Sequence, residues 1–129
     1  MTGLLLRSGC DVVDVARLAG AIARRPGLVD RVFTAREVAD ARRGGVSPGS
    51  ATEHARLAAR FAAKEATRKA LGDLRLPFTA VEVRTDPDGA PRLHVRGEPT
   101  GWSVSLSHDA GVALAFVVGF DPAPVPTAP

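Results

Sequence analysis

The chain has 129 residues, about the length of one average domain, so we expect a single compact domain. Hydrophobic residues make up 45% of the sequence and charged residues 24%, a mixture that is typical of an ordinary soluble protein and excludes a disordered chain. The formal net charge of +3 favours an acidic or phosphorylated partner.

Several classes of protein are disfavoured by what the sequence lacks. No apolar run approaches the ~18 residues of a membrane span, and three consecutive leucines near the start are too few for the core of a signal peptide. The chain has no tyrosine and few other aromatic residues, which argues against the stacking platforms of single-strand nucleic-acid binders. The single cysteine, Cys10, excludes an internal disulfide framework and suits a reducing cytoplasm. We therefore expect a cytoplasmic protein without membrane or nucleic-acid partners.

The first half of the chain predicts one strand followed by helices. An apolar segment from Leu4 to Val13 predicts a strand, and Asp14 can cap a helix that runs to about Arg25. Thr34 and Glu37 have the spacing of a capping box and predict a second helix, to about residue 43.

The longest predicted helix follows a second capping-box pattern. Ser50 and Glu53 have the required spacing, and they precede an alanine-rich helix from Ala51 to Leu71 that Gly72 closes.

After Gly72 the hydrophobic period changes from helical to two, which predicts strands. The expected elements are a hairpin with strands around residues 81–83 and 93–95, a strand over 102–107, and an almost wholly apolar, buried central strand over 111–120. We expect an α+β domain over residues 1–120, with helices packed on a small antiparallel sheet. Residues 121–129 hold four prolines and predict a frayed tail.

The first candidate functional residue is Asp11, at the end of the first predicted strand. An acid in this position is a common metal ligand and equally common as a helix cap. Asp14 is better explained as the cap.

The second candidate cluster lies on the long helix and contains both lysines of the chain. Among 17 basic residues only Lys64 and Lys69 are lysines, which suggests either chance or two positions that require a compact ammonium. Arg60 and Lys64 share one helix face, and Glu65 and Lys69 share another. Spacing alone favours a weak surface ion pair between Glu65 and Lys69, although Glu65 could also bind a divalent cation.

The third candidate cluster runs from Ser105 to Asp109. Adjacent Ser107, His108 and Asp109 have poor geometry for a hydrolase triad, and no Gly-x-Ser-x-Gly motif is present. The chain also lacks a phosphate-binding P-loop, a dinucleotide fingerprint and zinc-ligand spacing.

Taken together and in order, these clusters resemble the holo-acyl-carrier-protein synthase type of 4′-phosphopantetheinyl transferase. The resemblance covers roughly residues 5 to 120, and its most specific motif is Arg-Phe-Ala-Ala-Lys-Glu-Ala-x-x-Lys-Ala-x-Gly over residues 60–72. The other matching motifs are Gly9-Cys10-Asp11 with Arg17, Phe33 with Glu37, Gly89-Ala90-Pro91-Arg92-Leu93, and Ser105-Leu106-Ser107-His108.

Two segments depart from the family pattern. The connection after Gly72, over residues 73–77, is shorter than usual, and residues 97–101 replace a helix that the family has before its last two strands. The resemblance therefore leaves open a trimmed, pathway-dedicated enzyme or one with weakened activity.

The resemblance implies transfer of 4′-phosphopantetheine from coenzyme A to a serine of an apo acyl carrier protein, with release of adenosine 3′,5′-bisphosphate. It implies that Asp11 and Glu65 hold Mg²⁺, and that Lys69 stabilises or protonates the leaving group. The base that accepts the serine proton stays open between Glu65, another carboxylate and a water on the metal.

The resemblance also implies the binding surfaces. Coenzyme A would be bound by Arg60, Lys64, Lys69, Gly89, Pro91, Ser107 and His108. Arg17, Arg24 and Arg25 would dock the acidic carrier protein. The short type of this family forms homotrimers with each active site at a subunit interface, so the hairpin around Gly89 would contact a nucleotide held by a neighbour.

Two alternatives remain beside the transferase. A catalytically inactive relative that binds carrier protein or coenzyme A is suggested by the shortened connection, and a basic nucleic-acid-binding module by the net charge. The sequence does not distinguish a carrier protein of fatty-acid, polyketide or peptide biosynthesis.

Overall fold

The structure, a computed structural model, describes residues 4–121, so the predicted tail lies outside the described residues apart from Asp121, which ends the last strand. The helices and strands confirm the α+β fold class. Their bounds are β1 Leu5–Asp14, α1 Val15–Arg24, α2 Leu28–Val32, α3 Ala35–Ala41, α4 Ala51–Leu71, a 3₁₀ turn Phe78–Ala80, β2 Val81–Thr85, β3 Pro91–Val95, β4 Glu98–Pro99, β5 Ser103–Asp109 and β6 Val112–Asp121. Among these described elements, no helix combines the length and apolar character that crossing a membrane requires.

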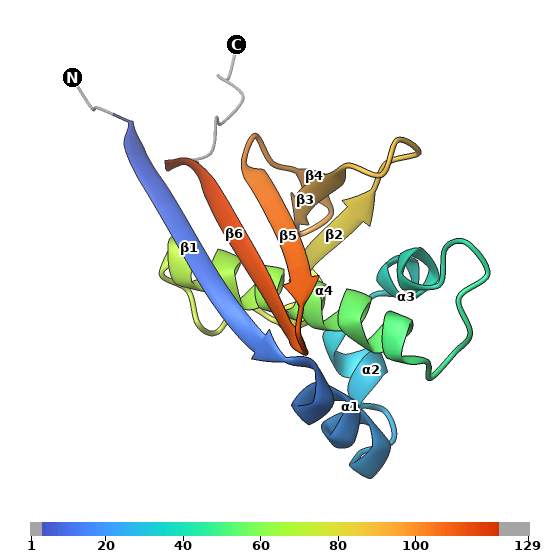
Figure 1. Ribbon diagram of the computed structural model, residues 1–129. Coiled ribbons are helices and arrows are strands. Elements are labelled where there is room, and N and C mark those ends of the chain that lie inside the picture. The colour runs from blue at the N-terminus through green and yellow to red at the C-terminus, as the bar shows by residue number, and fades with distance from the viewer. Residues whose placement is uncertain (1–3, 122–129) are drawn as a thin grey trace.

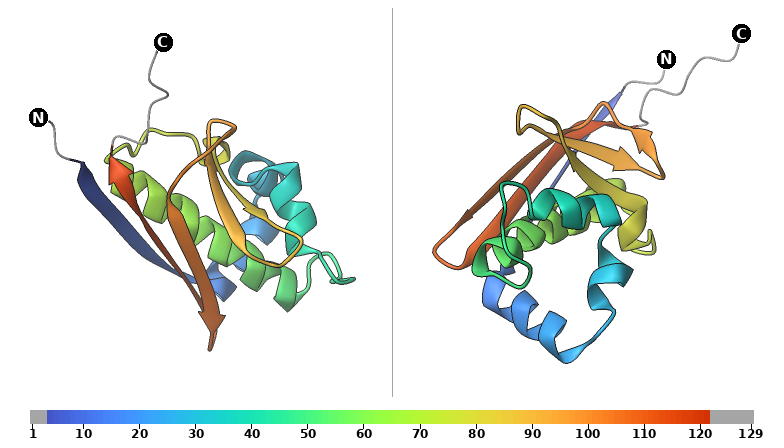
Figure 2. Two further views of the ribbon diagram at one scale, coloured as in Figure 1. Left: turned by 90° about the horizontal axis from the view of Figure 1, so that it is seen from above. Right: turned by 90° about the vertical axis from the view of Figure 1, so that its right-hand side faces the viewer.

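The strands form two antiparallel sheets of three strands each. The larger sheet has the order β1-β6-β5, and the smaller one, in the order β2-β3-β4, lies beside β5 (Figure 1). The predicted hairpin is confirmed as β2 and β3, with Val81 opposite Val95. Helix α4 crosses one face of the larger sheet, and the shorter helices gather around its N-terminal half (Figure 2).

Three of the predicted helix starts are confirmed by their caps. The Asp14 side chain accepts a hydrogen bond from the Arg17 amide and begins α1, and Thr34 and Glu37 form a complete capping box at α3. Ser50 caps α4 as expected. The capping box predicted there is wrong in its second half, because the Glu53 carboxylate accepts from the Gly49 amide and pairs with Arg42 instead.

Helix α2 was not predicted from the sequence. It has only five residues, and it begins after a glycine in the left-handed region, Gly27, without a side-chain cap. The sequence signals used for helix starts are therefore absent from it.

Close contact between α4 and β1 depends on small residues. Gly9 faces α4 so closely that a Cβ atom there would lie 2.1 Å from the Ala66 carbonyl oxygen and 3.2 Å from the Ala70 side chain. Ala62, Ala63, Ala66 and Ala70 are all buried in the core beneath the sheet. The alanine-rich composition of α4 thus sets how near the helix approaches the strands.

The prediction of a buried central strand is confirmed in the central position of β6 but is wrong about burial on one of its two faces. Ala113, Ala115 and Val117 are buried under α4, whereas Leu114 and Phe116 are 43% and 44% exposed. Strand side chains alternate between faces, and α4 covers only one face. We call the uncovered apolar side chains the outer face, and they are Leu6, Val12, Val112, Leu114, Phe116 and Phe120.

The short segment before β5 contains no helix, as its length predicts. It forms a two-residue strand, β4, and leads to Trp102, which is 8% exposed. The indole Nε1 donates to the Phe120 carbonyl oxygen at 3.0 Å, and the ring covers Gly119 so closely that a Cβ there would lie 2.1 Å from it. Trp102 therefore closes this end of the core.

Candidate active site

Asp11, Glu65 and Lys69 come together where β1 crosses the C-terminal half of α4. The Lys69 ammonium donates to Asp11 Oδ1 at 2.9 Å and to the Cys10 carbonyl oxygen at 3.4 Å. Asp11 lies two residues beyond Gly9 and on the same side of the strand, so the close approach at Gly9 sets its position against α4. Glu65 lies one helical turn before Lys69.

The charges in this cluster favour a protonated lysine. The hydrogen bond from Lys69 to Asp11 and the negative charge of Asp11 raise the pKa of Lys69, and the charge of Glu65 raises it further. Glu65 itself lies 3.7 Å from the Arg68 guanidinium. The surface pair between Glu65 and Lys69 that spacing alone favours is therefore not the arrangement found, because Lys69 turns to Asp11.

The donor set of the cluster fits one kind of metal site. Among residues 4–121 no group of three or more His, Cys, Asp or Glu side chains could hold a metal ion. Mg²⁺ does not need such a group, because one or two carboxylates can bind it together with substrate phosphates and water. Asp11 and Glu65 are 20% and 26% exposed and supply hard oxygen donors of this type.

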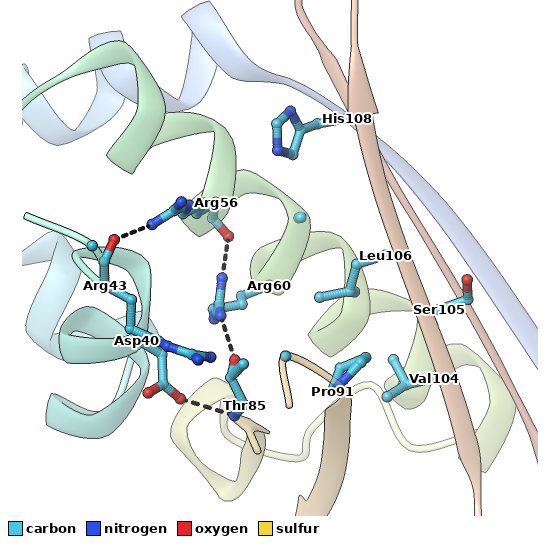
Figure 3. A pocket seen from close by; sticks show the side chains of 13 residues that line it. Asp40, Arg43, Arg56, Arg60, Thr85, Pro91, Val104, Ser105, Leu106 and His108 are labelled. Carbon is cyan, nitrogen blue, oxygen red and sulfur yellow. Dashed lines mark hydrogen bonds between the residues drawn. The ribbon is translucent and has the colours of Figure 1, made fainter. Parts of the chain in front are cut away.

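A second candidate site is an open cavity of about 660 Å³ between α3, α4, the β2–β3 hairpin and β5 (Figure 3). Four of the predicted coenzyme A-binding residues line it: Arg60, Gly89, Pro91 and His108. The cavity also contains Arg43 and Arg56, which were not predicted. Arg56 precedes Arg60 by four residues on α4, so helical spacing could have revealed it. Three arginines make this cavity suitable for an anionic ligand.

Hydrogen bonds hold two of these arginines in place. Arg60 donates to the Thr85 hydroxyl at 2.8 Å and to the Arg56 carbonyl oxygen at 3.0 Å. Arg56 donates to the carbonyl oxygens of Arg43, at 2.8 Å, and Ala41. Burial lowers the pKa of Arg60, and the Arg60 Nε atom is buried without a hydrogen-bond partner. A guanidinium nevertheless remains charged at neutral pH.

Lys64 lies in the core, outside the lining of the cavity, so its role as a ligand for coenzyme A stays a prediction that its position does not support. Its side chain is fully buried, and its ammonium lies 2.5 Å from Glu37 and donates to the carbonyl oxygens of Phe78 and Val81. Burial lowers the pKa of Lys64, while Glu37 opposes this effect. The three hydrogen-bond donors of the ammonium are therefore used within the core.

Ser107 and His108 lie on opposite faces of β5, because adjacent strand residues alternate. His108 lines the cavity, whereas Ser107 pairs with Leu114 in the register of β5 and β6 and shares its outer face. Both side chains are exposed. The structure thus separates two residues that the motif places next to each other.

The three arginines predicted to dock a carrier protein are exposed on or next to α1. Arg17 and Arg24 belong to the helix, and Arg25 follows it. Because α1 continues directly from β1, these arginines begin six residues after Asp11. A partner bound to α1 would therefore contact the helix that directly follows the strand carrying Asp11.

The Asp11 cluster and the cavity are two separate half-sites within one chain. Arg60 and Lys69 are nine residues apart, which is about 13 Å along the axis of a helix and half a turn around it. Asp11 belongs to β1 and His108 to β5, the two edge strands of the larger sheet. A single ligand that contacts the Asp11 cluster and the cavity of one chain would have to extend across the larger sheet. Alternatively, it could contact the Asp11 cluster of one chain and the cavity of another.

The comparisons with known proteins identify the family. Residues 7–117 match the family model of the 4′-phosphopantetheinyl transferase superfamily, and the chain therefore belongs to this family of transferases. Among curated relatives, a holo-[acyl-carrier-protein] synthase of Streptomyces avermitilis is 44% identical over 120 residues, covering 85% of this chain and 93% of the relative. The corresponding protein of Salinispora arenicola is 43% identical over 125 residues, covering 89% and 98%.

Solved structures agree with the curated relatives. The holo-(acyl-carrier-protein) synthase of Bacillus anthracis, in complex with CoA (3′,5′-ADP), has a TM-score of 0.75 and 29% identity, covering 90% of this chain and 96% of that one. The enzyme of Helicobacter pylori in complex with coenzyme A has a TM-score of 0.70 and 26% identity, covering 85% and 96%. These matches confirm the resemblance to holo-acyl-carrier-protein synthases and the fold that it implied.

Proposed function

We propose that this chain transfers the 4′-phosphopantetheine group of coenzyme A to a serine hydroxyl of an apo acyl carrier protein, releasing adenosine 3′,5′-bisphosphate. Curated relatives carry the name of this activity, and similar structures contain coenzyme A. The observation that carries the proposal is the cluster of Asp11, Glu65 and Lys69, which combines two carboxylates with a charged ammonium at an exposed position.

Asp11 and Glu65 would hold Mg²⁺ in the reaction. When bound, the metal neutralises negative charge on the phosphates of the substrate. Lys69 donates a hydrogen bond to Asp11 and remains half exposed, so its ammonium can turn toward a ligand beside the strand. There it would stabilise or protonate the departing bisphosphate, a role for which its raised pKa keeps it charged.

The arginine-lined cavity would bind the nucleotide end of coenzyme A. Arg60 supplies positive charge, His108 supplies a ring N–H donor, and Gly89 and Pro91 bring the hairpin against the same space. Arg17, Arg24 and Arg25 would attract the acidic carrier protein and orient its serine toward Asp11. We keep a cytoplasmic location as a prediction.

A homotrimer would unite the two half-sites. The Asp11 cluster lies at the β1 edge of the larger sheet and the cavity at the β5 edge, so a head-to-tail contact between copies can place one beside the other. The outer face offers a contiguous apolar surface for such a contact. The number of three copies comes from the family resemblance. In a closed ring, the β1 edge of each copy would meet the β5 edge of the next copy.

The competing function is that of an inactive relative that binds without transfer. The short connection after Gly72 suggests it, but that connection is held in place by the Arg68 guanidinium, which donates to the Leu74 carbonyl oxygen and lies over the Phe78 ring at 4.3 Å. The transfer assay decides between the transferase and the inactive relative.

The test is intact-mass measurement after incubation with coenzyme A, Mg²⁺ and a panel of apo carrier proteins from fatty-acid, polyketide and peptide pathways. We expect at least one carrier to gain a single phosphopantetheine group and the gain to disappear when a chelator removes Mg²⁺. Binding of coenzyme A without transfer to any carrier would instead support the inactive relative.

One variant tests the role of Glu65 in this assay, and a second variant serves as its matched control. We expect Glu65→Gln to remain folded and to lose transfer by roughly 10²-fold or more, because a carboxylate that would hold the metal is removed. Glu98→Gln changes an exposed glutamate of β4 outside both half-sites and should transfer like the unmodified protein. Equal activity of the two variants would remove Glu65 from the reaction.

A further inference from the structure

The free edge of β2 is completed by side chains from α3 and α4 instead of by another strand. In the order β2-β3-β4, none of the strands within residues 4–121 lies on the outer side of β2. Every second residue of β2 therefore directs its backbone N–H and C=O groups away from β3. Lys64 donates to the Val81 carbonyl oxygen, the Val83 amide donates to Glu37 at 2.9 Å, and the Thr85 amide donates to Asp40 at 2.9 Å.

These contacts connect the two walls of the arginine-lined cavity. One wall is formed by α3 and α4, which carry Asp40 and Arg60, and the other by the β2–β3 hairpin with Thr85, Gly89 and Pro91 (Figure 3). Thr85 is held from both sides, because its amide donates to Asp40 and its hydroxyl accepts from Arg60 at 2.8 Å. Thr85 is therefore one point at which the two walls are joined, beside the hairpin loop, where Arg43 donates to the carbonyl oxygens of Asp86 and Pro87.

We propose that Asp40 is a positioning residue that fixes the hairpin wall of this cavity by holding the Thr85 backbone amide. The proposal rests on the proposed function only in naming coenzyme A as the ligand of the cavity. Asp40 lies at the C-terminal part of α3, and its side chain is 13% exposed. One charged neighbour of Asp40 is Arg36, which lies 3.9 Å away on the helix surface and forms an ion pair too exposed to contribute much.

The position of Asp40 favours a hydrogen-bonding role over a purely electrostatic one. A partly buried amide that loses its acceptor pays a desolvation penalty, so Thr85 would shift to find another acceptor or water. Gly89 and Pro91 would move with it, since the hairpin continues from Thr85. The negative charge of Asp40 also raises the pKa of Arg60, and the test has to separate this effect from the hydrogen bond.

The experiment compares Asp40→Ala, Asp40→Asn and Arg36→Ala by coenzyme A affinity, steady-state kinetics and amide hydrogen exchange. We expect Asp40→Ala to weaken coenzyme A binding and raise its KM about tenfold, with kcat within about twofold. Exchange at the Thr85 amide should accelerate, while the Val83 amide, held by Glu37, should keep its protection. Asp40→Asn retains an acceptor oxygen without the charge and should recover most of the affinity, and Arg36→Ala should behave like the unmodified protein.

Two results would overturn the positioning role. One is unchanged Thr85 exchange and coenzyme A affinity in Asp40→Ala, and the other is an Asp40→Asn variant as impaired as Asp40→Ala, which would show that only the charge matters. Failure of the unmodified protein to bind coenzyme A or transfer its group would contradict the proposed function instead. The exchange rate at Thr85 would still decide the positioning role in that case, because it needs no ligand.

Discussion

At the scale of single residues, the two lysines of the chain have opposite environments. Lys64 is fully buried with Glu37, and Lys69 is 52% exposed and bound to Asp11. They are five positions apart, so their side chains point in directions about 140° apart around the axis of α4. One ammonium therefore belongs to the core and the other to the candidate site.

We expect replacement of Lys64 to affect stability and replacement of Lys69 to affect turnover. Lys64→Met leaves the Glu37 carboxylate buried without its counter-charge and should lower the free energy of unfolding by about 3–5 kcal/mol. Lys69→Arg keeps the charge at an exposed position, so the stability should change little, while turnover should fall by roughly 10²-fold because a guanidinium is a poor proton donor.

The measurements are chemical denaturation and the transfer assay on both variants. The double variant Glu37→Gln/Lys64→Met should be more stable than Lys64→Met alone, because neither charge is then left unpaired. Near-normal turnover of Lys69→Arg would show that the ammonium has no special role, and normal stability of Lys64→Met would contradict the buried pair.

At the scale of elements, the crossing of β1 and α4 sets the geometry of the Asp11 cluster. Gly9 lies against the backbone of Ala66, and both Asp11 and Lys69 lie within three residues of these contact points. A side chain at residue 9 would push the strand from the helix and separate the carboxylate from the ammonium. Packing in the core and alignment of the site therefore depend on the same contact.

We expect Gly9→Ala to reduce both stability and transfer. The added Cβ would meet the Ala66 carbonyl oxygen at 2.1 Å, and such overpacking typically costs about 1–3 kcal/mol. Thermal unfolding and the transfer assay measure the two effects. Gly101→Ala is a suitable control, because a Cβ there would meet nothing within 4 Å. If Gly9→Ala were as stable as this control, the close approach of β1 and α4 would not be required.

At the scale of the whole molecule, the charged half-sites and the outer face form one pattern. The half-sites lie at opposite edges of the larger sheet, and the uncovered apolar side chains lie on the face that α4 does not cover. A monomer would leave these side chains in water and its half-sites apart. The proposed ring of three copies would cover these apolar side chains and bring the half-sites of neighbouring copies together.

We expect Phe116→Asp to dissociate the assembly and abolish transfer. Phe116 lies in the centre of the outer face, where a buried carboxylate would have no partner. Sedimentation and the transfer assay should show a monomer without activity. Leu74→Asp places the same charge at a leucine that is 64% exposed away from the sheets, and its oligomeric state should match that of the unmodified chain. A Phe116→Asp protein that remains a trimer would place the interface elsewhere.

The sequence by itself determined the elements whose signals are local. Caps at Asp14, Thr34 and Ser50 begin the three helices that were predicted, and Gly72 ends α4 in the left-handed conformation. Period-two patterns located β2, β3 and β5, and apolar runs located β1 and β6, whereas the two-residue strand β4 was not predicted. Because these signals depend on hydrogen bonds and side-chain directions within a few residues, they can be recognised without the fold. The motif residues also identified the family correctly.

Only the tertiary structure decided which side chains meet. The pairing of Lys64 with Glu37 joins residues 27 positions apart, and that of Lys69 with Asp11 joins residues 58 apart. The uncovered face of β6 and the Asp40 contact with Thr85 likewise depend on where distant segments pack. A helical lysine next to a glutamate has the same local pattern whether it points into the core or toward a ligand. Burial and the choice of partner are properties of the packed chain, so spacing along the sequence could not distinguish these two lysines.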